Sequence, residues 1–435
     1  MKKVLIISNL FHSSPRICAI AKYLFEFGWE STVLTIPINK DSFYCLWCPP
    51  SGFEKKVRII ETPYQGDIFW FCRKIFKKLG FNTNQSILNQ SKEKIGINSK
   101  KSFIDYIFNF YQTIFGYPDD EKNWKKPAIK SGNKLLEKEK FDAIISSSSP
   151  VTSHIIASRL KKKFHISWIA DFRDLWTQNH NYPYPWWRKI FEKKLELKTL
   201  QSADALITVS PLWAKKLNSL HCNKKTYTIT NGFYPEEINY PLALLTKKFT
   251  IIYAGAIYVE NQNPEDFFVS LKELISENMI NPEEVEVRFY SGNLTWLKKE
   301  IEKYKLGNVI NIYEKVSRDE ILKKQNESQI LLLLCWADIK EKGWYPLKIF
   351  GYLASQRPIL AIGGNGEDMI EKLIMETKSG VYCKNKNEIK NFLKKLYSEY
   401  KKDGKVSYCG DLNEINKYSY KEKAREFADL LDKIS

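Results

Sequence analysis

Long hydrophobic runs are missing from this sequence of 435 residues. No stretch reaches the roughly 18 apolar residues that a bilayer-spanning helix needs, which excludes a protein built from such helices. Hydrophobic residues nevertheless make up 43% of the chain, enough for packed cores, so a disordered chain is also excluded. At about 150 residues per domain, the length predicts two or three domains.

Histidine and cysteine are scarce, with 5 and 8 residues respectively. The histidines show no metal-ligand spacing, and the single pair Cys45 and Cys48 has no further ligands nearby, so we expect no metal. The cysteines are scattered, a pattern typical of reduced thiols. The opening segment, Met1 to Ile7, is too short for a signal peptide, and we therefore expect a cytoplasmic protein.

The phosphate-binding and nucleophile motifs of several large enzyme classes are also missing. No G-x-G-x-x-G follows the first expected strand, and no G-x-x-x-x-G-K-[ST] is present. Their absence argues against a dinucleotide-dependent enzyme and a P-loop NTPase. No G-x-S-x-G marks the nucleophile turn of a hydrolase.

Positive charge is abundant and unevenly placed. The net charge is +18, and because residues 251–435 carry equal numbers of basic and acidic side chains, the whole excess lies in residues 1–250. A basic first part beside a neutral second part indicates an anionic partner for the first part. A membrane surface, an anionic polymer and nucleic acid all have this charge, but no nucleic-acid-binding module is recognisable, and we expect no nucleic acid.

Aromatic side chains are interleaved with the basic ones in two segments, residues 67–78 and 182–189. In the first segment Phe69 and Phe76 recur with Arg73 and Lys77 at roughly helical spacing. A basic helix with bulky aromatics can lie in a membrane interface. Burial of the same aromatic face in a protein core remains an equal alternative for this segment.

Apolar strands alternate with helical patterns twice along the chain. The first series opens with a strand over residues 4–8, a helix that begins at Pro15 and a strand over residues 31–35, and this βαβ order predicts a parallel sheet. The second series begins at residue 249. We expect an α/β protein with two Rossmann-like, doubly wound domains that face each other across a cleft, over residues 1–240 and 249–412, joined by a linker at 241–248.

The first chemically distinctive segment follows an apolar strand expected over residues 166–170. Asp171, Arg173 and Asp174 come directly after it, at the carboxyl end of the strand where doubly wound sheets bind ligands. A carboxylate there can accept a hydroxyl proton, and an arginine can bind an anionic oxygen. A salt-bridged turn that caps the next helix is the structural alternative.

Two further segments suit an anion. Pro346 begins a helix whose first-turn amides are available, and Lys348 adds a positive charge, a combination that fits a diphosphate. Solvation of Lys348 at an ordinary helix start is the alternative. Ser14, Pro15 and Arg16 place an arginine at another helix start, which is a weak signal on its own.

The order of these and other segments resembles the GT-B glycosyltransferases of family 4, of the kind found in bacterial surface-polysaccharide synthesis. The resemblance covers nearly the whole chain. The segments that carry it are Ser14 to Arg16, Tyr117 to Asp120 with Trp124, Ile145 to Pro150, Asp171 to Trp176, Ala203 to Ser210, Asn231 to Phe233, Lys348 to Phe350 with Tyr352 to Ser355, and Arg357 to Leu360.

The resemblance implies that the first domain binds the acceptor, that the second binds a nucleotide sugar, and that a helix over residues 413–435 crosses back to the first domain. It also implies retention and no metal, in agreement with the absence of an Asp-x-Asp pair. No cofactor is expected. Of the candidate residues, Asp171, Asp174 and Arg173 are assigned to catalysis, Gly255, Tyr345, Pro346, Leu347 and Lys348 to the donor, and Arg16, Ser149 and Asn231 to the acceptor or diphosphate.

The acceptor expected from the basic, aromatic first domain is a lipid-linked saccharide at the inner face of the cell membrane, which would make the protein peripheral and give it an anionic membrane surface as a partner. The chain departs from the family where a Glu-x7-Glu pair is usual, because Gly343 and Gly351 stand there. The usual Arg/Lys pair after Gly255 is also missing; Glu260, Glu341 and Lys342 are candidate substitutes. These departures keep a non-catalytic sugar-nucleotide or polysaccharide-binding protein, and a related epimerase, as alternatives.

Overall fold

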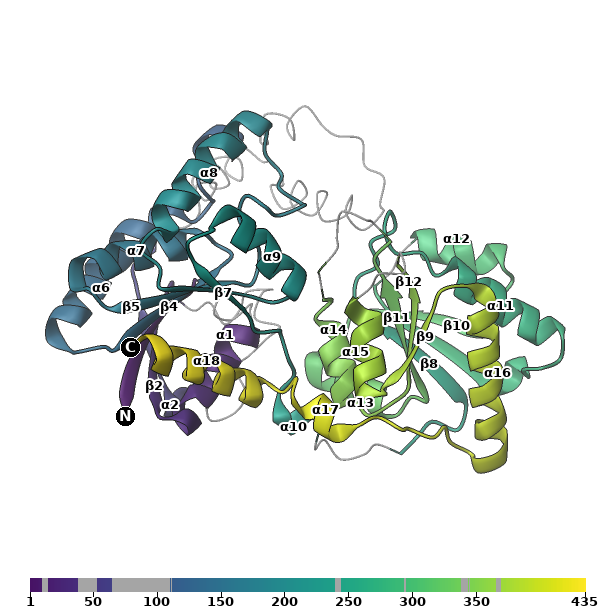
Figure 1. Ribbon diagram of the computed structural model, residues 1–435. Coiled ribbons are helices and arrows are strands. Elements are labelled where there is room, and N and C mark those ends of the chain that lie inside the picture. Colours follow the sequence, from purple (N-terminus) through teal and green to yellow (C-terminus); the bar gives the residue numbers. More distant parts are fainter. Residues whose placement is uncertain are drawn as a thin grey trace. The chain divides into compact units, whose positions relative to one another are not determined.

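The computed structural model describes residues 1–9, 15–37, 53–64, 110, 112–238, 244–292, 295–337, 343, 345–364 and 369–435. The described residues form two compact units (Figure 1). The described residues up to Asn231, together with residues 420–435, belong to the first unit, and those of residues 232–419 belong to the second. The expected linker at 241–248 lies partly outside the described residues, and its placement and the cleft stay predictions.

The first unit is built on a parallel sheet. Among the described residues it has seven strands in the order β3-β2-β1-β4-β5-β6-β7. The central strands are buried on both faces, as is usual where helices cover a parallel sheet on both sides. The strands are β1 (Lys2–Ile7), β2 (Trp29–Thr35), β3 (Val57–Glu61), β4 (Ala143–Ser148), β5 (Ser167–Phe172), β6 (Ala205–Thr208) and β7 (Lys225–Thr228).

The helices of the first unit begin and end at residues suited to those places. Pro15 opens α1 as predicted, and Ser210 caps α9 by accepting a hydrogen bond from the Trp213 amide at 3.2 Å. The last helix, α18, packs against α1. The described helices are α1 (Pro15–Tyr23), η1 (Leu24–Phe27), α2 (Phe53–Lys56), η3 (Lys122–Trp124), α6 (Lys125–Lys138), α7 (Thr152–Phe164), α8 (Trp186–Leu200), α9 (Pro211–Leu220) and α18 (Tyr420–Ile434).

The second unit repeats this architecture with six strands among its described residues, in the order β10-β9-β8-β11-β12-β13. All of its pairings are parallel. The strands are β8 (Phe249–Ala254), β9 (Val285–Tyr290), β10 (Ile310–Tyr313), β11 (Ile330–Cys335), β12 (Ile359–Gly363) and β13 (Gly380–Cys383). The helices are α10 (Pro235–Ile238), α11 (Glu265–Ser276), η4 (Pro282–Glu284), α12 (Thr295–Lys303), α13 (Arg318–Asn326), α14 (Lys348–Ala354), α15 (Met369–Thr377), α16 (Lys386–Asp403) and α17 (Leu412–Asn416).

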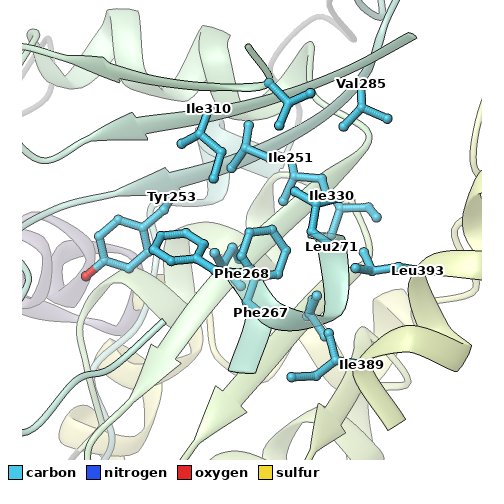
Figure 2. Packing of buried hydrophobic residues seen from close by; sticks show 14 of the residues in the cluster. Ile251, Tyr253, Phe267, Phe268, Leu271, Val285, Ile310, Ile330, Ile389 and Leu393 are labelled. Carbon is cyan, nitrogen blue, oxygen red and sulfur yellow. The ribbon is translucent and has the colours of Figure 1, made fainter. Parts of the chain in front are cut away.

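One face of the second sheet rests on a dense apolar core. Phe267 and Phe268 of α11 pack beneath Ile251 and Tyr253 of β8, as Figure 2 shows. Each of these side chains is completely buried. The core therefore fixes β8 and the start of the loop that follows it.

Strand β5 is longer than the sequence predicted. It was expected to end at Ala170 but continues through Asp171 and Phe172, which pair with Ile207 and Thr208 of β6. Asp171 is therefore a strand residue and not part of the following loop. The basic aromatic segment at residues 67–78 lies outside the described residues.

Candidate functional site

The order in which the strands are added to the sheet of the second unit reverses between β8 and β11, which is the switch point of this sheet. Strand β9 follows β8 on one side, and β11 lies on the other. In doubly wound sheets, ligands bind at the carboxyl ends of the strands beside such a switch point. Gly255 follows β8, and Trp336 follows β11. Gly255 and Trp336 therefore lie where a doubly wound sheet is expected to bind a ligand.

Gly255 allows Lys348 to reach this switch point. Its φ of +121° is one that other residues rarely adopt, and a Cβ built at this position would lie 2.9 Å from Lys348 Nζ and 3.2 Å from Cε. The lysine side chain thus passes directly over the bare backbone after β8. The two residues, 93 positions apart, were both assigned to the donor, and the structure brings them together.

Lys348 sits beside a tyrosine and is half-buried. Its Nζ donates a hydrogen bond to the Tyr253 hydroxyl at 2.7 Å and lies 4.1 Å from the centre of that ring. The Tyr253 hydroxyl in turn donates to the carbonyl of Ala256 at 2.7 Å. Burial lowers the pKa of Lys348 to about 7. Since no described carboxylate pairs with it, an anion that arrives beside Lys348 would favour its charged form.

Helix α14, which carries Lys348, is anchored at the same switch point. The Tyr352 hydroxyl accepts from the Ala254 amide and donates to the Leu332 carbonyl, both at 3.2 Å. Burial raises the pKa of this tyrosine well above its usual value. These contacts bind the helix to β8 and β11 together, so the position of Lys348 is set by the sheet.

The other predicted donor residues have different surroundings. Tyr345 is buried, with its ring centre 5.8 Å from that of Phe350, and Pro346 is buried beside it. Leu347 is 39% exposed. The structure therefore places Gly255 and Lys348 side by side at the switch point, and places Tyr345 and Pro346 in the packing around α14.

The two glycines that stand in place of the family's glutamates differ from each other. Gly343 is buried and has a φ of +97°. A Cβ at Gly351, on α14, would meet no atom within 4 Å. Position 351 thus has room for a side chain that the chain does not supply. Glu260 is exposed, and Glu341 and Lys342 lie outside the described residues.

The first sheet has its own switch point, between β1 and β4. Asn9 follows β1 and is only 4% exposed, yet neither its Oδ1 nor its Nδ2 has a hydrogen-bond partner among the residues that the structure describes. Ser149 follows β4 and is exposed. Asn231, after β7, is buried and its Oδ1 also lacks a partner. Unpartnered buried amides are costly, which makes Asn9 and Asn231 candidate ligand-binding residues.

Arg16 and Asp171 form a fully buried ion pair. The Nη2 of Arg16 donates to Asp171 Oδ1 at 2.9 Å, and its Nη1 donates to the Thr230 carbonyl at 2.6 Å. Ser147 donates to Asp171 Oδ2 at 2.8 Å, and the two charged side chains are both 0% exposed. Because Asp171 lies inside β5, its carboxylate faces α1 instead of solvent. The pair holds α1 to the sheet and, in this structure, presents no charge to a ligand.

Arg173 and Asp174 lie in the loop after β5 and remain accessible. The Nη2 of Arg173 donates to Asp174 Oδ2 at 3.0 Å, and the two side chains are 21% and 37% exposed. Ser148 Oγ donates to the Asp174 carbonyl at 3.0 Å, which ties this loop to the end of β4. Of the three residues assigned to catalysis, these two can reach a ligand.

Sequence reasoning missed Tyr253, Tyr352 and Asn9. The two tyrosines occur in apolar segments that predict only burial, and their hydroxyl partners come from distant parts of the chain. Asn9 directly follows the first strand, and its place before a helix that begins at Pro15 was the available signal.

One family model matches part of the chain. It is described as Glycosyltransferase Family 4 and matches residues 108–237, which lie in the loops and elements of the first unit up to the start of the second. No curated protein matches the sequence.

Solved structures match over the whole chain. A glycosyltransferase from Rickettsia africae is 14% identical, with a TM-score of 0.55 and coverage of 100% of this chain and 98% of the other. Anabaena Alr3699/HepE in complex with UDP and glucose is 10% identical, with a TM-score of 0.58 and full coverage of both chains. A UDP-N-acetylglucosamine 2-epimerase is 12% identical, with a TM-score of 0.52 and coverage of 99% and 95%. The predicted fold class is confirmed: the chain has two parallel α/β sheets and matches GT-B glycosyltransferases in fold.

The described residues lack a metal-binding cluster and a membrane-spanning helix. No group of three or more His, Cys, Asp or Glu side chains there is arranged to hold a metal ion. None of the helices in the same residues is long and apolar enough to cross a membrane.

Proposed function

We propose that the protein is a glycosyltransferase that moves a sugar from a nucleoside diphosphate sugar to an acceptor hydroxyl. The observation that carries this proposal is the approach of Lys348 to Gly255 at the switch point of the second sheet. A lysine with no described carboxylate partner, over bare backbone, suits a diphosphate. The family match at residues 108–237 supports the same reaction class.

In the proposed reaction, the bond between the anomeric carbon and the diphosphate oxygen breaks, and the acceptor oxygen forms the new bond to that carbon. The proton of the acceptor hydroxyl passes to the departing diphosphate. Negative charge develops on the departing diphosphate. Lys348 stabilises that charge, and because it is held by Tyr253 before the substrate arrives, little reorganisation is needed. The reaction is proposed to retain the anomeric configuration and to need neither a metal nor a cofactor.

The accessible loop after β5 is the proposed acceptor site. Asp174 accepts a hydrogen bond from the reacting hydroxyl, and Arg173 binds an acceptor phosphate or the donor diphosphate. Ser149 and Asn231 complete the polar lining. Arg16 and Asp171 act as positioning residues, because their buried ion pair fixes α1 and β5 around this loop.

A uridine nucleotide is the first donor to test. The HepE structure, which shares the fold, is a complex with UDP and glucose. The proposed acceptor is a lipid-linked saccharide of surface polysaccharide synthesis, and the protein is proposed to work as a peripheral protein at the inner face of the cell membrane. The net positive charge of +18, which comes entirely from residues 1–250, supports an anionic membrane partner.

A non-catalytic sugar-nucleotide-binding protein is the second candidate. Gly343 and Gly351 favour it, because the chain lacks both acids that the family usually directs at the donor. An epimerase is a third reading, since a 2-epimerase shares the fold. The binding protein would bind the nucleotide sugar without transferring the sugar. The epimerase would change the configuration of the sugar without transferring it.

The test is a thermal-shift panel of UDP, GDP, CDP and their sugar conjugates, followed by incubation of each stabilising donor with and without lipid-linked saccharides. Release of the diphosphate together with a labelled lipid product supports a transferase. Stabilisation without release supports the binding protein, and isomerised sugar supports an epimerase. The absence of any shift contradicts the donor site.

A further inference from the structure

Helix α8 of the first unit has its polar side turned inward. Arg188, Glu192 and Glu196 are at most 1% exposed. Large apolar side chains on the same helix are exposed instead: Trp186 by 75%, Trp187 by 40%, Ile190 by 47%, Phe191 by 57% and Leu197 by 38%. A helix on a soluble protein normally shows the opposite arrangement.

A polar network holds the inner side of α8 in this orientation. Arg188 Nε donates to Glu192 Oε1 at 2.7 Å, and Trp176 Nε1 donates to Glu192 Oε2 at 3.0 Å. Glu196 accepts hydrogen bonds from the amide and hydroxyl of Thr177. Because every buried charge has a partner, the helix cannot turn its aromatic side inward without breaking several buried hydrogen bonds.

A second exposed apolar segment is fastened to α8. The Arg188 guanidinium donates to the carbonyls of Gln112, Thr113, Gly116 and Pro118 at 2.7–3.2 Å. This segment exposes Ile114 by 45% and Phe115 by 47%. Together, the exposed residues of α8 and of residues 112–115 are called the aromatic face below.

Lysines accompany the aromatic face. Lys189, Lys193, Lys194 and Lys198 are exposed on α8, whereas both glutamates of the helix are buried. The apolar residues occupy mainly the first two turns, and three of the lysines follow them. The exposed side of the helix therefore carries positive charge and no negative charge.

We propose that the aromatic face docks on an anionic lipid bilayer, with Trp186, Trp187 and Phe191 in the interface and the lysines against the headgroups. This inference deepens the membrane partner named in the proposed function and rests on it. Tryptophan favours the membrane–water interface, and basic side chains add affinity for anionic lipid. A second copy of the chain is the alternative occupant of this face, and the experiment below distinguishes it from a bilayer.

Docking through α8 would also place the proposed acceptor loop near the membrane. Trp176 and Thr177, which hold the inner side of the helix, follow Arg173 and Asp174 by two to four residues in the same loop. A lipid-linked sugar would thus meet the polar residues that are proposed to bind it.

The experiment is sedimentation of the full chain with vesicles of phosphatidylcholine alone or with about one third phosphatidylglycerol. The wild-type chain is expected to bind the anionic vesicles, less strongly in high salt. Trp186→Ser with Phe191→Ser should lower the partition coefficient about tenfold or more. A triple variant should also bind the anionic vesicles about tenfold or more weakly, since each lysine contributes roughly fivefold or less. Its substitutions are Lys193→Gln, Lys194→Gln and Lys198→Gln.

Matched controls lie on the second unit. Met279→Ser with Met375→Ser removes two side chains that are 45% and 71% exposed, and Lys298→Gln, Lys299→Gln and Lys394→Gln removes three exposed lysines. Both controls should bind as the wild type does. Equal melting temperatures among the variants establish that any loss of binding is not a loss of folding.

Wild-type binding that survives the aromatic substitutions overturns the inference. A wild-type chain that ignores anionic vesicles also overturns it, and concentration-dependent dimerisation lost in the same variant would then assign the face to a second copy. Nucleotide-sugar turnover is measured on the same chain with lipid-linked saccharides dispersed in detergent, so that transfer does not depend on vesicle binding. Vesicle binding without turnover refutes the transferase but agrees with membrane docking through α8. Turnover without vesicle binding supports the transferase and refutes membrane docking.

Discussion

Gly255 and Lys348 lie so close that any side chain at position 255 would collide with the lysine. A Cβ there would be 2.9 Å from Nζ. The lysine is therefore directed at the backbone after β8, where the strand order of the second sheet reverses. The proposed donor site depends on this relationship.

Gly255→Ala should weaken nucleoside diphosphate binding about tenfold or more, because the new methyl group displaces Lys348. The strained backbone, at φ +121°, should also cost about 1–3 kcal/mol of unfolding free energy. Gly404→Ala is the matched control, since its φ is +68° and its Cβ would meet nothing within 4 Å. The control should lose about 1 kcal/mol of stability and keep its nucleotide affinity. Calorimetric titration that finds equal affinities for both variants would contradict this role of Gly255.

Nucleotide affinity should fall as the pH rises above about 7. The pKa of Lys348, lowered by burial to about 7, means that the unliganded lysine is increasingly neutral above that pH. A bound diphosphate favours the charged form, so binding above pH 7 must take up a proton, and affinity falls by at most about tenfold per pH unit. Titrations in buffers of different ionisation enthalpy measure the uptake. A wild-type chain as insensitive to pH as Lys348→Ala would count against the assignment.

Asp171→Asn should destabilise the chain by about 3–5 kcal/mol, because it leaves the buried Arg16 guanidinium without its carboxylate. The double change Arg16→Met with Asp171→Leu should recover much of that loss, since it removes both buried charges. Chemical denaturation measures both effects. An unchanged stability of Asp171→Asn together with lost turnover would instead make Asp171 a residue that touches substrate.

Asp174→Asn should behave in the opposite way. Its ion pair with Arg173 is partly exposed, and such pairs contribute about 0–1 kcal/mol, so stability should hardly change. Turnover with acceptor should fall strongly while nucleotide affinity stays the same, because the proposed contact is with the acceptor hydroxyl. Weakened nucleotide binding with normal turnover would remove Asp174 from the acceptor site.

The fold could be predicted from the sequence because its strands are short apolar runs separated by amphipathic helices. Pro15 and the first two strands illustrate this, since local composition alone places them. The end of β5 could not be predicted in this way. Asp171 resembles a loop residue in the sequence, but its ion pair with Arg16, 155 positions away, and its hydrogen bond from Ser147 make its place in a buried strand tolerable.

The candidate site was predictable in part for a similar reason. Lys348 and Gly255 were recognisable by residue type and by their places at a helix start and a strand end. Their mutual contact, and the hydroxyl of Tyr253 beside them, depend on packing between elements that are far apart in the chain. The inward-facing polar side of α8 also contradicts what its composition suggests. Arg188 and Glu192 pair with each other on the helix, and other segments supply further hydrogen bonds: Trp176 donates to Glu192, and carbonyls of residues 112–118 accept from Arg188.

The most direct test of the proposed function is the rate at which the stabilising nucleotide sugar releases its diphosphate in the presence of acceptor. Wild type, Lys348→Ala and Lys394→Ala are compared, the last being an exposed lysine on α16. The account predicts turnover by the wild type and by Lys394→Ala, and a loss of about a hundredfold or more in Lys348→Ala, the scale of other charge-stabilising groups. Equal turnover by Lys348→Ala and the wild type would contradict the proposed donor site.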